Sequence, residues 1–178
     1  MESIREVLLD RSKIGFLVAK GIYFSEGKLK RNMPGAAFIF PCQGSQYPYM
    51  LRDLCERFPV VADTFHEADE IMNELGQKNI TSLIFPDSSK FDKSSTNDAL
   101  KDTQVLQPMI LTADTAIFRL LRRVGLRPVA CAGHSLGEYA ACVASGVLSF
   151  RHALEAVAVR GREMARVSLA DPGLMMSI

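Results

Sequence analysis

The sequence predicts an α/β fold in which a mostly parallel sheet is flanked by helices. Two short apolar runs, at residues 36–40 and 128–132, have the length of buried strands, and each passes at once into a glycine-containing loop. Between them, apolar residues recur at the three- and four-residue spacing of helices. Strands that alternate with helices form parallel sheets with helices on both faces, and ligands bind at the carboxyl ends of such strands.

The N-terminal half is expected to hold the first strand and several helices. Besides that strand, the expected segments are a helical lead-in at 4–20, a polar connector at 27–32, helices at 49–58 and 60–75 that meet at Pro59, and a solvated loop at 86–96. Residues 1–34 are therefore expected to be a lead-in or linker, and residues 35–178 the domain itself.

The C-terminal half is expected to alternate helix, strand, helix and helix. The expected segments are a helix at 110–124 that ends at Gly125, the strand at 128–132, a helix directly after the glycine loop, and a helix at about 151–169. No internal repeat is present in the sequence.

The segment GHSLGE at residues 133–138 has the layout of a nucleophile elbow. In that arrangement a strand, a sharp turn and a helix hold a serine hydroxyl exposed, and N–H groups at the helix N-terminus stabilise a developing oxyanion. Gly133 and Gly137 lack side chains that would keep the strand and the helix apart. The pattern predicts Ser135 as the nucleophile and His134 as a support of the turn rather than a base, because consecutive side chains at a strand end point in different directions.

A second motif, PCQGSQ at residues 41–46, follows the first predicted strand. With GHSLGE, and with Arg160 one helix later, it resembles the acyl-CoA:acyl-carrier-protein acyltransferase family. That family includes the malonyl transacylases of fatty acid synthesis and the acyltransferase domains of polyketide and polyunsaturated fatty acid synthases. The segment TQVLQP at residues 103–108 also resembles the family, and the likeness runs from about residue 35 to the end of the chain.

The resemblance implies a serine acyl-enzyme mechanism. Ser135 would attack the thioester of malonyl-CoA or a related acyl-CoA, and the backbone N–H groups of Gln43 and Leu136 would form the oxyanion hole. Arg160 would pair through its fork of donors with the free carboxylate of a malonyl-type acyl group. The phosphopantetheine thiol of an acyl carrier protein would then take the acyl group. CoA enters as part of the substrate, and no tightly bound cofactor is expected.

The helical pattern itself also marks Arg160. This residue occupies the open place in an apolar stripe formed by Ala153, Val157, Met164 and Val167. A guanidinium directed toward a core is costly unless an anion meets it. From the pattern alone, a ligand-binding arginine is as strongly favoured as a structural one that either pairs with Asp or Glu or extends its guanidinium to the solvent edge. Three other arginines lie off this stripe and are expected to be solvated: Arg151, Arg162 and Arg166.

The general base is not evident in the sequence. Surface or capping roles are expected for His66 and His152. In the resembled family the catalytic histidine lies downstream of the arginine, beyond a small ferredoxin-like subdomain, and residues 174–178 resemble the first strand of that subdomain. The resemblance therefore implies a hydrolase-like large subdomain that is incomplete at its C-terminus and impaired in transfer. A gene fragment, a split subunit and an artificially shortened form of the protein are all compatible with this pattern. The expected partners therefore include a C-terminal remainder or a larger synthase.

Cys42 departs from the family pattern, which has glycine at this position. A side chain here either shifts the Gln43 amide or is harmless, depending on whether the local φ is negative.

Composition and charge fit a soluble intracellular domain. A formal net charge of +1 over 178 residues, with no basic run, argues against nucleic acid as a partner. The sequence shows no membrane-length apolar stretch, signal peptide, metal-ligand cluster or glycine-rich phosphate loop. The four cysteines lack C-x-x-C spacing, which predicts free thiols and a cytoplasmic location: Cys42, Cys55, Cys131 and Cys142.

The sequence thus predicts the transfer of a malonyl-type group from CoA to a carrier protein. One alternative is a serine hydrolase of the esterase or thioesterase type, which shares the elbow but has no need of the QGSQ loop or an inward Arg160. The other alternative is a non-catalytic docking or vestigial module that keeps the fold without turnover.

Overall fold

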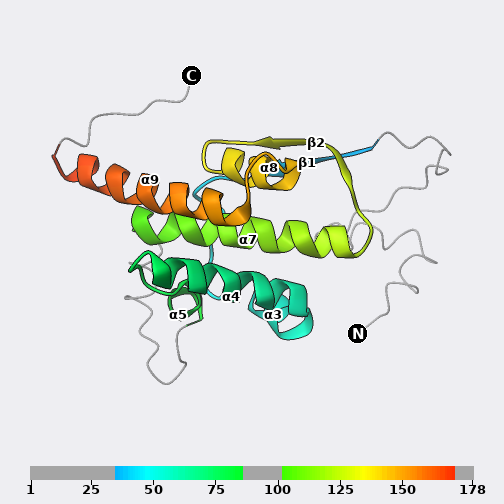
Figure 1. Cartoon of the computed structure of the whole chain (residues 1–178), viewed down its shortest axis with the longest axis horizontal. Helices are drawn as coiled ribbons and strands as arrows, with labels where there is room; N and C mark the ends of the chain where they lie inside the picture. The colour runs from blue at the N-terminus through cyan, green and yellow to red at the C-terminus, as the bar shows by residue number, and fades with distance from the viewer. Residues whose placement is uncertain (1–34, 86–101, 171–178) are drawn as a thin grey trace, which may run out of the picture. The chain divides into compact units, whose positions relative to one another are not determined.

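A computed structural model of the chain describes residues 35–85 and 102–170, the last four of these by their backbone alone (Figure 1). The expectations for residues 4–20, 27–32, 86–96 and 174–178 lie outside the described residues. The described part is helix-rich and contains a small parallel sheet. Its elements are β1 (Ala36–Phe40), α3 (Arg52–Arg57), α4 (Pro59–Glu74), α5 (Ile80–Ile84), α7 (Thr103–Arg123), β2 (Pro128–Gly133), α8 (Gly137–Ser145) and α9 (Phe150–Ala170).

The two predicted strands pair in parallel, as expected. Phe40 lies opposite Gly133 at the carboxyl ends, so the two motif loops leave the sheet side by side. On one face, the Phe118 ring of α7 packs edge-on against Phe38 and Phe40, with ring centroids 6.2 and 6.4 Å apart. The other face is open in the described part, since the Ile39 side chain is 79% exposed. Among the described residues, helices cover one face of the sheet, and the expectation of helices on both faces stays a prediction.

Helix α7 is the central element: α4 packs on one side of it, and α8 and α9 pack on the other (Figure 1). It begins at Thr103, earlier than the predicted residue 110, because Pro108 lies inside the helix instead of ahead of it. The Asp102 side chain caps this end by accepting a hydrogen bond from the Gln104 N–H at 3.0 Å. Gly125 follows the helix with φ 90°, as its predicted role as a stop requires.

The helices after β1 differ from the prediction in two ways, since α3 begins later than expected and α5 is an additional helix. Helix α3 begins at Arg52 rather than at residue 49, because Tyr49 and Leu51 adopt left-handed φ values of 59° and 65°. Helix α5 was not predicted. Its first turn is held by the buried Asp69, whose carboxylate accepts hydrogen bonds from the Thr81 N–H and hydroxyl.

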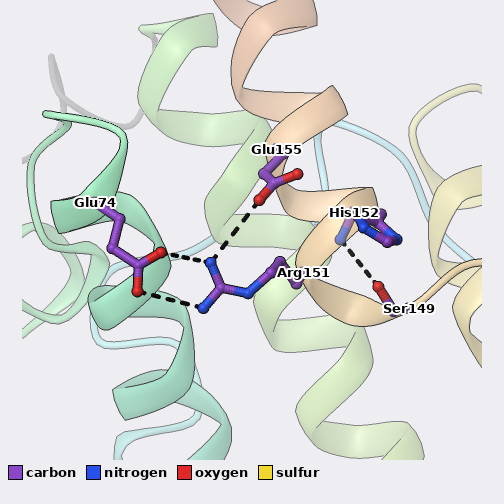
Figure 2. Close-up of polar contacts among 5 residues, drawn as sticks. All are labelled: Glu74, Ser149, Arg151, His152 and Glu155. Carbon is purple, nitrogen blue, oxygen red and sulfur yellow. Dashed lines mark hydrogen bonds and ion pairs between the residues drawn. The ribbon is translucent and has the colours of Figure 1, made fainter.

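Helix α9 is joined to α4 by a surface ion pair, shown in Figure 2. Arg151 Nη1 donates to Glu74 Oε2 at 2.6 Å and lies 3.8 Å from Glu155 Oε1. The guanidinium holds the pKa of the Glu74 carboxyl below its ordinary value. Near the same end, the His152 N–H donates to Ser149 Oγ at 3.2 Å, which satisfies one N–H of the first turn.

The elbow depends on two glycines that allow backbone to meet backbone. A Cβ at Gly133 would lie 2.1 Å from the Gly137 carbonyl oxygen, and a Cβ at Gly137 would lie 2.2 Å from the Phe40 carbonyl oxygen. Between them, Ser135 adopts a left-handed φ of 52°. Helix α8 therefore begins in direct backbone contact with the end of β1, as the motif predicts.

Replacing Gly137 with alanine is expected to destabilise the protein by about 3 kcal/mol or more. The new Cβ would clash with the backbone carbonyl oxygens of Phe40 and Pro41, which cannot move freely. The matched control is Gly146→Ala at the other end of α8. Gly146 has φ 79°, and a Cβ added there would meet no heavy atom within 4 Å, so this change adds only backbone strain, about 1 kcal/mol. Urea unfolding of both variants measures the difference, and equal losses would contradict the close approach.

Asp114 is a carboxylate among apolar neighbours on α7. Its Oδ2 is buried and has no hydrogen-bond partner among the described residues. The other side chains that line the same hollow are all non-titratable, and they come from residues 37–40 of β1, from Pro41 after it, and from Ile117, Phe118 and Leu121 of α7. Burial raises the pKa of Asp114 from 3.8 to about 7.

This raised pKa predicts a pH-dependent stability. The folded state holds the Asp114 proton more tightly than the unfolded chain, so stability is lost as the pH rises from about 4 to above 7. Asp114→Asn is therefore expected to gain roughly 2–4 kcal/mol relative to the parent between pH 4 and pH 8. Urea unfolding across this range provides the measurement, with the exposed Asp63→Asn as control. Parallel pH profiles for Asp114→Asn and the parent would contradict the assignment.

Candidate active site

Ser135 and Arg160 meet where β2 gives way to α8. Arg160 reaches from the middle of α9, and its Nη2 donates to Ser135 Oγ at 3.2 Å. Its Nη1 donates to Gln107 Oε1 at 2.5 Å. The guanidinium is therefore held at one nitrogen by an amide of α7, while another nitrogen faces the serine hydroxyl. No carboxylate among the described residues pairs with Arg160, so the ion-paired structural arginine is not what this part of the chain shows.

Gln107 is completely buried, and both ends of its amide are used. The oxygen accepts from Arg160, while the nitrogen donates to Thr103 Oγ1 at 2.8 Å and to Met164 Sδ at 3.3 Å. An amide buried without these partners would cost about 1–3 kcal/mol for each orphaned group. Gln107 thus fixes the guanidinium of Arg160 relative to α7 as well as α9.

The loop after β1 is attached to the same network. Gln43 Nε2 donates to Thr103 Oγ1 at 2.9 Å, so one hydroxyl on the first turn of α7 accepts from both Gln43 and Gln107. Cys42 is not among the described non-glycine residues with positive φ, and its side chain packs against the core. The cysteine at this position therefore needs no glycine-like backbone, which decides the alternative that the sequence left open.

The two expected oxyanion donors are the N–H groups of Gln43, in the loop after β1, and of Leu136, in the turn after β2. Neither the Gln43 N–H nor the Leu136 N–H donates to another group in the described part of the chain. The elbow is held instead by neighbouring bonds, from the His134 N–H to the Phe40 carbonyl at 3.3 Å and from the Gly137 N–H to the His134 carbonyl at 2.9 Å. The Leu136 side chain is completely buried, so it contributes to the core rather than to an open surface.

The three histidines lie at exposed positions. The hydrogen-bond partner of Ser135 Oγ among the described residues is Arg160, not a histidine. His134 takes part through its backbone, and His152 lies in the first turn of α9 beside the Arg151 ion pair (Figure 2). His66 lies on the solvent side of α4.

Sequence reasoning missed three residues that position this site. Gln107 and Thr103 were noted only as part of a motif ahead of a helix, whereas they form the first turns of α7 and link Gln43 to Arg160. Gly161 is the third, since a Cβ there would lie 2.8 Å from the Thr103 carbonyl oxygen. It lets α9 pack backbone to backbone on α7 next to Arg160, and the Arg-Gly pair in the sequence was the available signal.

The described part contains no group of three or more His, Cys, Asp or Glu side chains placed to hold a metal ion. Its helices include none with the length and apolar character needed to cross a membrane. The cysteines are free thiols.

Comparison with known proteins shows that the chain is similar to acyltransferases. The chain is 38% identical over 146 residues to the malonyl CoA-acyl carrier protein transacylase of Bacillus subtilis, covering 82% of this chain and 42% of that protein. The acyl transferase domain of ZmaA matches with a TM-score of 0.72 and 28% identity, over 79% of this chain and 32% of that one. A malonyl-transacylase solved with its type II polyketide synthase acyl-carrier protein matches with a TM-score of 0.65 and 36% identity, over 75% of this chain and 40% of that one.

The match to the Bacillus subtilis protein thus spans less than half of that relative's length. The family described as "Acyl transferase domain" matches residues 37–178, which include both motif loops and Arg160. This chain belongs to the acyl transferase domain family.

Proposed function

We propose that Ser135 accepts a malonyl-type acyl group from CoA and passes it to the phosphopantetheine thiol of an acyl carrier protein. The observation that carries this proposal is the guanidinium of Arg160, held by Gln107 with its Nη2 3.2 Å from Ser135 Oγ. A guanidinium in this place lies within reach of a carboxylate on an acyl group bound to the serine. The malonyl transacylases among the similar proteins support the same assignment.

The proposed reaction consists of two half-reactions, and Ser135 takes part in both. Ser135 Oγ attacks the thioester carbonyl and gives its proton to a base, the Gln43 and Leu136 N–H groups stabilise the oxyanion, and CoA leaves as its thiol. The carrier-protein thiol then attacks the acyl-serine ester and restores the serine hydroxyl. CoA is part of the substrate, and no tightly bound cofactor is required.

Arg160 supplies the selectivity for an acyl carboxylate. A guanidinium carries five N–H donors, and the bonds to Gln107 and Ser135 use two of them. The remaining three allow a bidentate pair with a planar carboxylate, which lysine reproduces poorly. Retention of the carboxylate also favours carrier-protein transfer over the neutral-ester hydrolysis of an esterase, which would have no use for this arginine.

The base is proposed to come from outside the described residues. Ser135 is paired with Arg160 and not with a histidine, so the serine–histidine couple is not assembled by these elements. By the family resemblance, the base is a histidine carried beyond a small ferredoxin-like subdomain, and the described part is the hydrolase-like large subdomain. Transfer by this chain alone is accordingly impaired. If no base is supplied, a non-catalytic docking role is the second candidate function. The free cysteines support a cytoplasmic location for both candidates.

Ser135 is expected to carry the acyl group. Malonyl-CoA is incubated with the chain alone and with a completed protein, in which the chain is fused to the portion of the Bacillus subtilis transacylase that it does not match. Peptide mass spectrometry should find a malonyl adduct on Ser135, faster in the completed protein, and none in Ser135→Ala. Ser45→Ala, in the loop after β1, is the matched control and should keep the adduct. An adduct that survives Ser135→Ala, or one confined to Cys42, would reject the assignment.

Arg160 is expected to discriminate between acyl groups. In the completed protein, Arg160→Ala should lower malonyl transfer about 30- to 1,000-fold more than acetyl transfer, because a charge-assisted bidentate pair contributes roughly 2–4 kcal/mol. The exposed Arg162→Ala on the same helix is the control and should leave both rates near those of the parent. The ratio of kcat/KM for the two acyl-CoA substrates is the measurement. An equal loss for both would indicate a structural role.

A further inference from the structure

A hollow of about 590 Å³ lies at the end of α7 that is remote from Ser135. It is lined by the last turns of α7 and α8, by Val60 of α4 and by Arg127, which precedes β2. Along α7, the usual helical rise places Arg122 about 22 Å from Gln107, the residue that positions Arg160. Figure 1 shows the chain turning back from α7 into β2 at this end, whereas the turn from β2 into α8 lies at the other. The hollow is therefore separate from the candidate active site.

Four arginines line this hollow, and one of them is already paired. Arg119 Nη1 donates to Glu67 Oε2 at 2.6 Å, and its guanidinium lies over the Phe150 ring, 5.0 Å from the ring centre. No acidic side chain of the described part lines the hollow. The remaining arginines are exposed and form no ion pair with any described residue: Arg122, Arg123 and Arg127.

The positive charge of the hollow is only partly offset by its surroundings. Glu67 offsets one of the four guanidinium charges. The C-termini of α7 and α8 both border the hollow, and the carbonyl groups at each contribute roughly half a negative charge. About two positive charges therefore remain, which matches the double negative charge of one phosphoryl group near pH 7. A single carboxylate would balance only half of them.

The hollow also offers an apolar surface to an organic group. Arg122 lies over the Phe118 ring at 5.8 Å, so an aromatic side chain borders the charged part. Small-molecule sites usually have volumes of about 300–1,000 Å³ and combine an apolar lining with a few polar groups, and this hollow fits that description. Its apolar lining comes from three helices: Val60, Phe118, Val143 and Ala144.

We infer that this hollow binds a phosphorylated organic molecule of about nucleotide size. The phosphoryl group lies among Arg122, Arg123 and Arg127, whose guanidinium groups match phosphate oxygens through paired N–H donors. The organic part rests on the apolar lining. This inference rests on the charge and shape of the hollow and not on the chemistry proposed for Ser135.

Isothermal titration calorimetry tests the inference with ADP and phenyl phosphate as probes. At least one of them should bind the chain, or the completed protein defined above, with a Kd of about 1 mM or tighter. Adenosine, which lacks the phosphoryl group, should not bind. The completed protein keeps the test decisive if the chain does not fold by itself. Absence of binding by both phosphorylated probes to both proteins would overturn the inference.

Two double variants of equal charge localise the binding. Arg123→Gln with Arg127→Gln removes two unpaired arginines of the hollow and should weaken binding at least about tenfold. Arg162→Gln with Arg166→Gln removes the same charge from exposed positions of α9 outside the hollow and should keep the parent affinity. Equal urea-unfolding midpoints verify that both double variants fold. Equal affinities for the two double variants would overturn the assignment to this hollow.

A lipid headgroup is the other source of a phosphoryl group, and vesicles distinguish it from a free ligand. Vesicles of phosphatidylcholine and phosphatidic acid in equal amounts are compared with vesicles of phosphatidylcholine alone by sedimentation. The inference predicts that ADP or phenyl phosphate binds in solution without any vesicle. Binding to the phosphatidic acid vesicles, with no binding of either soluble probe, would contradict it and would indicate a membrane-facing surface instead.

Discussion

The buried amide of Gln107 is the interaction on which the arrangement of the site depends. It is enclosed among apolar side chains of α7 and α9, so each of its polar atoms must find a partner there. Its oxygen takes Arg160 and its nitrogen shares the Thr103 hydroxyl with Gln43. Three segments far apart in the sequence are thereby fixed to one another before any substrate binds. Arg160 faces Ser135 because of this network rather than through its own helix alone.

The elbow adds a second constraint, which acts on the backbone. A left-handed serine costs roughly 1–3 kcal/mol and persists only when its surroundings hold it there. Here the Phe40 and His134 carbonyls bind the N–H groups of residues on either side of Ser135, and Gly137 brings α8 against β1. The strain therefore serves to present the hydroxyl to the guanidinium. The two constraints meet at the 3.2 Å contact between Ser135 and Arg160.

The sequence allowed prediction of what local patterns encode. Glycine spacing predicted the close backbone approach at Gly133 and Gly137. Helical periodicity predicted that Arg160 shares a side of its helix with the buried Ala153 and Val157, although Met164 of the predicted stripe is 39% exposed. The role of Gln107 could not be predicted, because Arg160 and Met164 lie 53 and 57 residues away from it in the sequence. In addition, Pro108 concealed that α7 begins at Thr103. The elements that cover each face of the sheet could not be predicted for a related reason. A short apolar run indicates a buried strand, but it does not show which element covers each face of that strand.

A double-mutant cycle between Gln107 and Arg160 tests the central claim most directly. Gln107→Met, Arg160→Met and the double variant are compared by urea unfolding. A control cycle pairs Gln107→Met with Arg166→Met instead of Arg160→Met, because the Arg166 side chain is 79% exposed. The Gln107–Arg160 pair should show a coupling free energy of about 1.5–3 kcal/mol, since each single change leaves a buried polar group unpaired. The Gln107–Arg166 pair should be additive within about 0.5 kcal/mol. Additivity for Gln107 and Arg160 would contradict the account, because Arg160 would then hold its position without the buried amide.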